Sequence, residues 1–322
     1  MATVIVSAPL PGPALGRLEA AGHRVILGES PSGLGRDGIL KVLKGHPEAS
    51  ALVALLSDRV DEGVLDAGKS LRIVANYAVG VDNLDLSELK KRGIAATNTP
   101  GVLTEATADL SMALMLDACR NVTRGDRLVR EGKWEGWSPT LLVGPRVTGA
   151  TLGIVGFGRI GQAVAARARG FCMRVLYTQR NRAAPETEQA LGATFVSLDD
   201  LLAQSDIVSL HCPLTDSTRG LLNESRMRRM RPGSVLINCG RGPCVDEAAL
   251  AKMLRDGHLG AAGLDVYERE PEIHAALLSL PNVVLAPHLG SADAPTRERM
   301  AEMSVGSVLD VLAGREPPNR VV

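Results

Sequence analysis

The strongest constraint on the fold is a glycine-rich turn between a strand pattern and a helix pattern. Leu152–Val155 is an apolar run, and glycines follow at positions 156, 158 and 161, which is the spacing G-x-G-x-x-G. The Ala-rich segment Gln162–Arg169 is then typical of a helix, and Met173–Tyr177 of a second strand. In such a unit the glycines permit a tight turn, a close backbone approach to a pyrophosphate, and close packing of helix against strand. The unit therefore predicts a dinucleotide site on a parallel sheet.

The residues that follow the second strand of this unit bear on the choice of dinucleotide. Sites for NAD usually place Asp or Glu about 20 residues beyond the glycine loop, where it bonds the ribose hydroxyls. This chain has Thr178-Gln179-Arg180-Asn181-Arg182 there, without a carboxylate and with two guanidinium groups that can pair with a 2′-phosphate. A solvated loop with incidental arginines is the alternative interpretation. We expect NADP, bound in part by Gln179, Arg180 and Arg182, with NAD as the alternative cofactor.

Short apolar runs alternate with helical patterns over most of the chain, which predicts parallel sheets with helices on both faces. At 322 residues the chain is long enough for two domains, and aromatic residues make up only 2%, so the cores must be mostly aliphatic. Thr104–Asn121 indicates a long helix too apolar for a surface position, and the irregular stretch Arg124–Pro145 carries both tryptophans. The final helical pattern, Ala294–Ala313, cannot be assigned to either domain from its pattern alone.

The charge and cysteine content argue against several classes of partner and site. Lys+Arg and Asp+Glu are both 36, which gives no reason to expect nucleic acid or an anionic membrane. No run approaches the ~20 apolar residues of a membrane span, and the N-terminus lacks a signal-peptide pattern, so we expect a cytoplasmic protein. The five cysteines lack C-x2-C spacing. We therefore expect buried free thiols and no metal site, even at His211, Cys212, Cys239 and Cys244.

Three downstream segments follow predicted strands, where doubly wound sheets place their ligand crevices. They contain Arg241, Glu270 and His288. Reduction of a 2-keto acid needs a cation for the carboxylate and carbonyl, a proton donor, and a carboxylate that keeps this donor protonated. Each residue alone has a simpler interpretation, as a loop cation, a helix-entry acid or a loop histidine. Only the combination of all three indicates a catalytic site for this reduction.

Together with other motifs, these segments resemble the D-isomer-specific 2-hydroxyacid dehydrogenase family over essentially the whole chain. The matching motifs, in family order, are Val79-Gly80-Val81-Asp82, Thr99-Pro100-Gly101, the glycine loop, His211-Cys212-Pro213-Leu214, and the Arg, Glu and His segments. Within the family the sequence is most similar to the branch of glyoxylate/hydroxypyruvate reductases. That similarity lies in Leu55-Leu56-Ser57-Asp58, Trp134-Glu135-Gly136-Trp137, Tyr177-Thr178 followed by Arg180, and His288-Leu289-Gly290-Ser291.

The resemblance implies an α/β fold with two doubly wound parallel-sheet domains and an active site in the cleft between them. A flavodoxin-like substrate-binding domain would comprise residues 1–99 and 289–322, which assigns the last helix to it. A Rossmann dinucleotide-binding domain would comprise residues 100–288. Its long helix and the arm around Arg124–Pro145 would form a homodimer.

The resemblance also implies roles for individual residues. Arg241 would bind the substrate carboxylate and polarise the carbonyl, and His288 would be the proton donor in reduction. Glu270 would pair with His288 and keep it protonated near neutral pH, and the backbone N–H groups of Val79 and Gly80 would hold the carboxylate. Residues expected to line the cofactor are Gly156, Gly158, Arg159, Ile160, Gly161, Pro213, Cys239, Asp265 and Gly290, with Asp265 bonding the nicotinamide carboxamide. Pocket shape would depend on Leu56, Trp137 and Ser291.

The expected reaction is the NADPH-dependent reduction of glyoxylate or hydroxypyruvate to glycolate or D-glycerate. An NAD(P)-dependent D-2-hydroxyacid dehydrogenase acting on other keto acids, or a phosphite dehydrogenase, is the alternative within the fold. From a different class, one branch of the family serves as a dinucleotide-sensing corepressor and can keep the Arg, Glu and His. Trp137 would either reach into the neighbouring subunit's active site or serve as an ordinary interface anchor.

Overall fold

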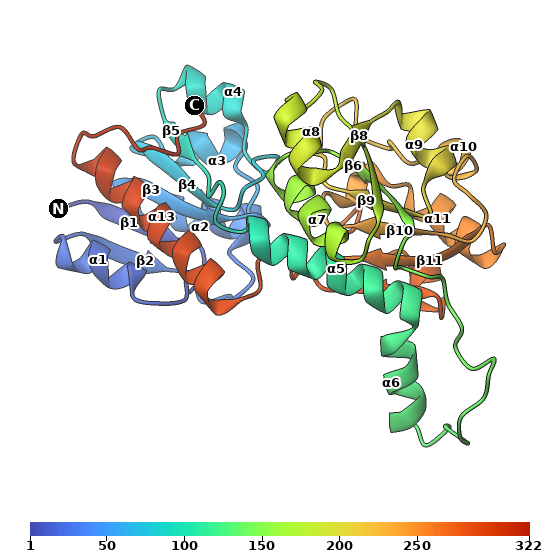
Figure 1. Ribbon diagram of the computed structural model, residues 1–322. Coiled ribbons are helices and arrows are strands. Elements are labelled where there is room, and N and C mark those ends of the chain that lie inside the picture. The colour runs from blue at the N-terminus through green and yellow to red at the C-terminus, as the bar shows by residue number, and fades with distance from the viewer. The chain divides into compact units, whose positions relative to one another are not determined.

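The computed structural model describes residues 1–322, which divide into two compact units. Unit one comprises Met1–Leu103 and Ser291–Val322, and unit two comprises Thr104–Gly290. Each unit is built on one sheet in which all paired strands are parallel (Figure 1). The expectation of two doubly wound α/β domains is therefore confirmed.

Unit one has the strand order β2-β1-β3-β4-β5, which is the flavodoxin-like arrangement. Its strands are β1 (Thr3–Val6), β2 (Arg24–Leu27), β3 (Ala49–Leu55), β4 (Ile73–Tyr77) and β5 (Ala95–Thr97). Its helices are α1 (Ala14–Ala20), α2 (Gly35–Gly45), α3 (Glu62–Ala67), α4 (Leu86–Lys91) and α13 (Ala294–Leu312).

Helices cover both faces of this sheet because successive strand residues point to opposite sides and both sides are apolar. On β3, for example, Leu52 joins the core beneath α2, α3 and α4, whereas Val53 joins the core beneath α1 and α13. The last helix, α13, contributes the fully buried residues Ala301, Val305 and Val308 to the second core. Tertiary contact thus places in unit one a helix whose sequence pattern fits either domain.

Unit two has the strand order β12-β11-β10-β9-β6-β7-β8, which is the Rossmann order extended by one strand. Its strands are β6 (Thr151–Val155), β7 (Arg174–Thr178), β8 (Ala193–Phe195), β9 (Ile207–Leu210), β10 (Ser234–Asn238), β11 (Leu259–Leu264) and β12 (Val283–Leu285). Its helices are α5 (Thr104–Arg120), α6 (Val122–Arg130), α7 (Arg159–Gly170), α8 (Pro185–Leu191), α9 (Leu198–Gln204), α10 (Glu224–Met227), η1 (Gly242–Cys244), α11 (Glu247–Arg255) and α12 (Ala275–Leu278). The chain moves outward from β6 to β8 and then returns to β9 beside β6, which makes a topological switch point.

The stretch expected to be irregular, Arg124–Pro145, is irregular only in its second part, because α6 occupies Val122–Arg130. Asn121 has a left-handed φ of 55°, which ends α5 one residue earlier than expected and starts the new helix. The Asp117 carboxylate accepts a bond of 2.7 Å from the Thr123 N–H at the open end of α6. No residue of α6 is buried, so the expected signal of an apolar face packed on a core is absent.

In Figure 1, α6 and the loop that returns from it project away from the rest of unit two. We call residues 121–147 the arm. None of the helices combines the length and hydropathy needed to cross a bilayer.

Candidate active site

The glycine loop joins β6 to α7, and each of its three glycines meets a different steric demand. Gly156 has a left-handed φ of 93°, and a Cβ there would lie 2.5 Å from the backbone nitrogen of Cys212. A Cβ on Gly161 would lie 2.2 Å from the carbonyl oxygen of Gly156, so this glycine allows α7 to pack closely on the loop. A Cβ on Gly158 would meet nothing within 4 Å, which leaves its backbone open to a ligand.

The start of α7 is therefore suited to a dinucleotide. The first intrahelical bond runs from the Gln162 N–H to the Gly158 carbonyl, at 2.9 Å, so the N–H groups of Arg159, Ile160 and Gly161 remain at the open end of the helix. Three such groups, together with the helix dipole, favour a phosphate. This fit rests on the shape of the loop and on the direction of its N–H groups.

The residues after β7 differ in whether their side chains already bind other groups of the protein. Gln179 Oε1 accepts a 3.1 Å bond from the Phe157 N–H, which fixes the amide against the glycine loop and leaves its NH₂ group as a donor. Arg182 binds both carboxylate oxygens of Glu188 at 2.8 Å through Nε and Nη2. This guanidinium, followed by the Tyr177 hydroxyl, lowers the pKa of Glu188 to about 2. Arg180 is exposed and forms no ion pair, so of the two arginines only Arg180 is uncommitted.

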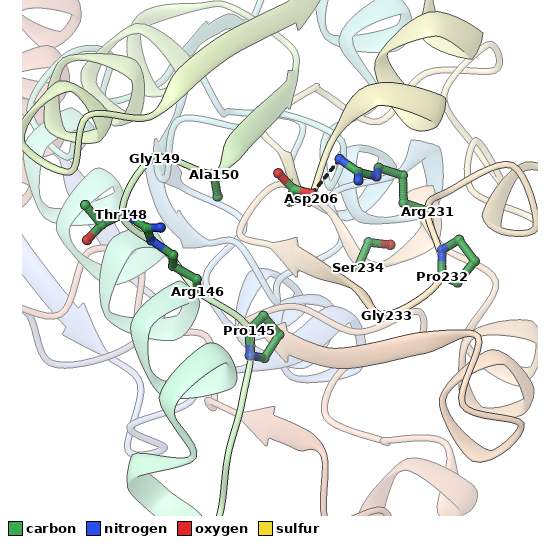
Figure 2. A pocket seen from close by; sticks show the side chains of 10 residues that line it. All are labelled: Pro145, Arg146, Thr148, Gly149, Ala150, Asp206, Arg231, Pro232, Gly233 and Ser234. Carbon is green, nitrogen blue, oxygen red and sulfur yellow. Dashed lines mark hydrogen bonds and ion pairs between the residues drawn. The ribbon is translucent and has the colours of Figure 1, made fainter.

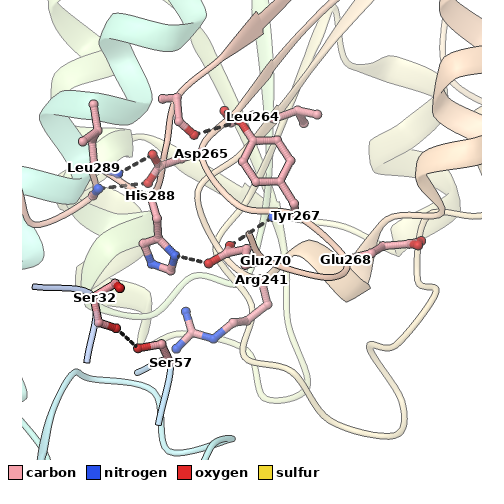
Figure 3. A network of polar contacts seen from close by, with 12 residues as sticks. Ser32, Ser57, Arg241, Leu264, Asp265, Tyr267, Glu268, Glu270, His288 and Leu289 are labelled. Atoms are coloured by element: carbon pink, nitrogen blue, oxygen red, sulfur yellow. Dashed lines mark hydrogen bonds and ion pairs between the residues drawn. The ribbon is translucent and has the colours of Figure 1, made fainter. Parts of the chain in front are cut away.

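The sequence-predicted proton donor and its partner are in direct contact. His288 Nδ1 lies 2.7 Å from Glu270 Oε2 (Figure 3). The other carboxylate oxygen of Glu270 accepts a bond of 3.1 Å from the Tyr267 N–H. The two side chains remain 30% and 29% exposed, so a substrate can reach the ring of His288. With Nδ1 turned to a carboxylate, Nε2 is the atom available to exchange a proton.

Asp265 holds the turn that carries His288, a role that sequence reasoning did not identify. His288 has a left-handed φ of 54°, which is unusual for a residue other than glycine. The Asp265 carboxylate accepts bonds of 2.6 and 2.9 Å from the N–H groups of Leu289 and Gly290, and its carbonyl accepts one of 3.0 Å from the His288 N–H. Asp265 is only 1% exposed, and this burial raises its pKa to about 6 against the effect of the two N–H bonds.

Arg241 follows β10 in a turn that the Asn238 side chain holds. Asn238 donates to the Arg241 carbonyl at 3.1 Å and accepts from the Gly240 N–H at the same distance. A Cβ on Gly242 would lie 1.9 Å from the Tyr267 carbonyl, so glycine brings this turn against the one that leads to Glu270. Arg241 Nη1 donates to the Gly240 carbonyl at 2.9 Å, and in the view of Figure 3 the Arg241 side chain lies below the ring of His288.

These residues share one edge because β10, β11 and β12 are adjacent and parallel. Arg241 follows the first strand, Asp265 and Glu270 the second, and His288 the third. Because these three strands are consecutive in the chain and adjacent in the sheet, the residues that follow them lie next to one another along its carboxyl edge. Pro213 follows β9 at the same edge, and Cys239, only 8% exposed, directly follows β10.

The remaining predicted site residues belong to unit one or to the arm. Leu56 follows β3 and is 43% exposed, and Val79 and Gly80 follow β4 at the carboxyl edge of that sheet. Ser291 is the first residue of the segment that returns to unit one. Trp137 lies in the arm with 83% of its surface exposed.

A pocket of about 400 Å³ opens at the opposite, amino edge of the unit-two sheet (Figure 2). It is lined by Pro145, Arg146, Thr148, Gly149, Ala150, Asp206, Arg231, Pro232, Gly233 and Ser234. Arg231 and Asp206 pair across it at 2.7 Å. None of the predicted site residues lines this pocket, so the candidate site is the carboxyl edge with the glycine loop and the Arg, Glu and His turns.

Comparison with known protein families gives a match for the greater part of the chain. The sequence profile of the family D-isomer specific 2-hydroxyacid dehydrogenase, NAD binding domain, matches residues 112–290. This range includes the glycine loop, Arg241, Glu270 and His288.

Individual relatives extend the similarity over both units. A glyoxylate reductase from Thermococcus kodakarensis is 51% identical over 284 residues, which cover 87% of this chain and 85% of that protein. The TT0316 protein from Thermus thermophilus has a similar structure, with a TM-score of 0.90, 47% identity and coverage of 99% of this chain and 100% of its own. An NADPH-dependent glyoxylate/hydroxypyruvate reductase from Sinorhizobium meliloti, solved with NADP and malonate, has a TM-score of 0.88, 34% identity and coverage of 100% and 97%.

Proposed function

The chain belongs to the D-isomer-specific 2-hydroxyacid dehydrogenase family, and from this premise we propose that it reduces glyoxylate to glycolate with NADPH. The family makes it an oxidoreductase that binds a nicotinamide dinucleotide. The observation that carries the proposal is the 2.7 Å contact of His288 with Glu270, at the edge that also bears Arg241. Hydroxypyruvate, reduced to D-glycerate, is included because a structural neighbour is a reductase of both acids.

The proposed chemistry assigns one task to each of the three side chains. Arg241 binds the substrate carboxylate and polarises the carbonyl that is reduced. A bound NADPH supplies a hydride for the carbonyl carbon. His288 donates the proton on Nε2 to the carbonyl oxygen, which completes the two-electron reduction to an alcohol. Glu270 accepts the bond from Nδ1–H, and thereby orients the ring and stabilises its positive charge.

The preference for NADPH is proposed from the residues after β7. Arg180 is the exposed cation that can pair with a 2′-phosphate, and the Gln179 NH₂ group is a donor where NAD enzymes carry a carboxylate acceptor. Arg182 is the weaker candidate because Glu188 already occupies its guanidinium. For the substrate, we propose that the N–H groups of Val79 and Gly80 bind the carboxylate, and that Leu56, Trp137 and Ser291 limit the size of the pocket.

A homodimer is proposed from the arm. Its exposed apolar residues are Val122, Val129, Trp134, Trp137, Leu141 and Val143. An apolar surface of this kind marks an interface, and a second copy is the partner that every solution of the protein contains. Light scattering after size exclusion should give twice the 33.9 kDa of one chain. If the Trp137→Ala dimer persists with a raised KM for glyoxylate, Trp137 reaches a site; if it dissociates, Trp137 is an interface anchor.

The deciding experiment is a spectrophotometric panel of NADPH and NADH with glyoxylate, hydroxypyruvate and pyruvate, run beside phosphite with NADP⁺ and NAD⁺. We expect oxidation of NADPH with glyoxylate and hydroxypyruvate, and a higher kcat/KM than with NADH. Turnover of pyruvate or phosphite alone would assign the chain to another activity of the fold. Cofactor binding without any turnover would favour a dinucleotide-sensing role.

A further inference from the structure

The turn after β4, residues 78–81, is held through its carbonyl oxygens. The Asn98 Nδ2 group donates to the Val79 carbonyl at 2.8 Å, and the Asn76 Nδ2 group donates to the Gly80 carbonyl at 2.7 Å. The backbone holds the carbonyls on either side: Ala78 O accepts from Thr99 N at 2.9 Å, and Val81 O accepts from Leu84 N at 3.0 Å. Every carbonyl of the turn is therefore directed into unit one.

This arrangement decides where the N–H groups of the turn point. The peptide bonds here are trans, so each N–H is directed opposite to the carbonyl of the same peptide unit. The N–H groups of Val79, Gly80 and Val81 consequently face away from the groups that hold their carbonyls, and none of the three donates a hydrogen bond within the protein. The three residues are only partly buried, which leaves these donors accessible. Successive N–H groups that converge in this way form a receptor for an anion.

The orientation of the Asn76 amide is determined by its surroundings. Asn76 lies in β4 and is 1% exposed. Its Oδ1 accepts from Asn83 Nδ2 at 3.0 Å, and Asn83 also donates to the carbonyls of Leu55 and Asp58 at 3.0 and 3.1 Å. Because Oδ1 faces the Asn83 donor, the Asn76 NH₂ group must face the Gly80 carbonyl.

Asn98 is held from another direction, by the C-terminal segment. Its backbone N–H donates to the Asn319 carbonyl at 3.3 Å, and the Asn319 side chain donates to the Asn98 carbonyl. Asn98 follows β5, the strand next to β4, so its side chain reaches the Val79 carbonyl across the sheet edge. Two asparagines on neighbouring strands thus hold consecutive peptide units of one turn.

We propose that Asn98 and Asn76 are positioning residues that turn the N–H groups of Gly80 and Val81 outward. Together with the Val79 N–H, whose peptide unit the Thr99 backbone N–H holds, these groups form a three-donor receptor for the substrate carboxylate. The identity of the anion rests on the proposed function. The Val81 N–H is a donor that the sequence did not indicate. Neither asparagine touches the substrate, and each acts only through the peptide unit that it holds.

The first test is Asn98→Ala, which removes the donor to Val79 and keeps the backbone. Loss of the oriented Gly80 N–H should raise KM for glyoxylate roughly tenfold, with kcat and the KM for NADPH unchanged. Asn98→Asp places an acceptor beside the Val79 carbonyl and should raise that KM further. The matched control is Asn282→Ala, which removes a similar amide bond, 3.1 Å to the Gly260 carbonyl in unit two. If Asn98→Ala, like this control, only lowers Tm, the positioning role is wrong.

The second test does not depend on turnover. Oxalate, a dianion that cannot be reduced here, is titrated into ¹⁵N-labelled protein saturated with NADP⁺, and backbone amide resonances are followed. The Gly80 and Val81 amides should shift in the wild type, and at roughly tenfold higher oxalate in Asn98→Ala. If these amides shift but glyoxylate is not reduced, the proposed function is wrong and the anion receptor is supported. If glyoxylate is reduced but these amides do not shift, the receptor is wrong and the proposed function stands.

Discussion

The two units place different kinds of chemical groups at the carboxyl edges of their sheets. Unit two presents side chains, with Arg241, Glu270 and His288 at the ends of three adjacent strands. Unit one presents backbone N–H groups, in the turn after β4, and its side chains Asn76 and Asn98 act from behind that turn. Side chains such as His288 and Arg241 can transfer a proton or carry a full charge, whereas a backbone N–H group can only donate a hydrogen bond. We therefore expect substitution of His288 in unit two to affect the chemical step, and substitution of Asn98 in unit one to affect substrate binding.

The largest effect should follow from His288→Ala, which removes the proton donor. Loss of a general acid typically lowers kcat by about 10²–10⁴-fold. Single-turnover rates with NADPH measure this, and retained quenching of protein fluorescence by NADPH shows that the cofactor site is intact. The comparison of the two units is sharpened if Asn98→Ala changes KM while His288→Ala changes kcat. A loss of kcat in both variants would contradict the expected division between substrate binding in unit one and chemistry in unit two.

A second difference concerns what holds each turn. The turn of unit one is held by amides, which do not titrate, whereas the His288 turn is held by Asp265, whose pKa burial raises from 3.8 to about 6. Folding thus favours the protonated carboxyl, so the stability this provides is lost as pH rises through about 6. Between pH 4 and 6 the wild type should lose about 2 kcal/mol of unfolding free energy relative to Asp265→Asn.

Urea unfolding of both proteins at several pH values between 4 and 7 measures this difference. Asn98→Ala serves as the control, because the amide bond it removes carries no proton equilibrium. Its stability relative to the wild type should stay constant over the same range. A parallel pH dependence of wild type and Asp265→Asn would show that Asp265 is not the titrating group.

Of the two kinetic effects expected from substitutions in unit two, the smaller lies at the end of β7 and concerns cofactor binding. Arg180→Ala should raise KM for NADPH about 10–100-fold, as expected for loss of one charge-assisted bond to phosphate, and leave KM for NADH unchanged. Arg182→Ala should raise it less, because Glu188 already binds that guanidinium. Steady-state kinetics with both cofactors decides the order. Equal effects of the two substitutions would mean that the Arg182–Glu188 pair opens when NADPH binds.

The sequence was informative where chemistry is carried by local spacing or by a side chain. The G-x-G-x-x-G loop forms the expected turn between β6 and α7, and its glycines meet steric demands that other residues would violate. Arg241, Glu270 and His288 reach one edge because consecutive strands of a parallel sheet end on the same side. The fold class followed from the alternation of apolar runs and helical patterns.

Other features depend on contacts that no local pattern encodes. The helix α6 is amphipathic in sequence but has no buried residue, so its own pattern does not decide what its apolar face packs against. Arg182 was expected to be available for a phosphate, but its partner Glu188 is supplied by the next helix, α8. The Asp265 carboxylate accepts hydrogen bonds from the backbone N–H groups of Leu289 and Gly290, which lie 24 and 25 residues further along the chain. The bonds of Asp265 form only because β11 and β12 lie side by side.

The sequence by itself determined the family, the two parallel-sheet domains, and the identity of the groups that can move a proton or bind an anion. The tertiary structure decided which of these groups are in contact, because a bond such as His288 Nδ1 to Glu270 Oε2 at 2.7 Å joins the ends of different strands. It also decided the direction of the N–H groups in unit one. Every residue other than proline carries a backbone N–H, so only the folded positions of Asn76, Asn98 and the Thr99 backbone distinguish those of Val79, Gly80 and Val81 as a receptor.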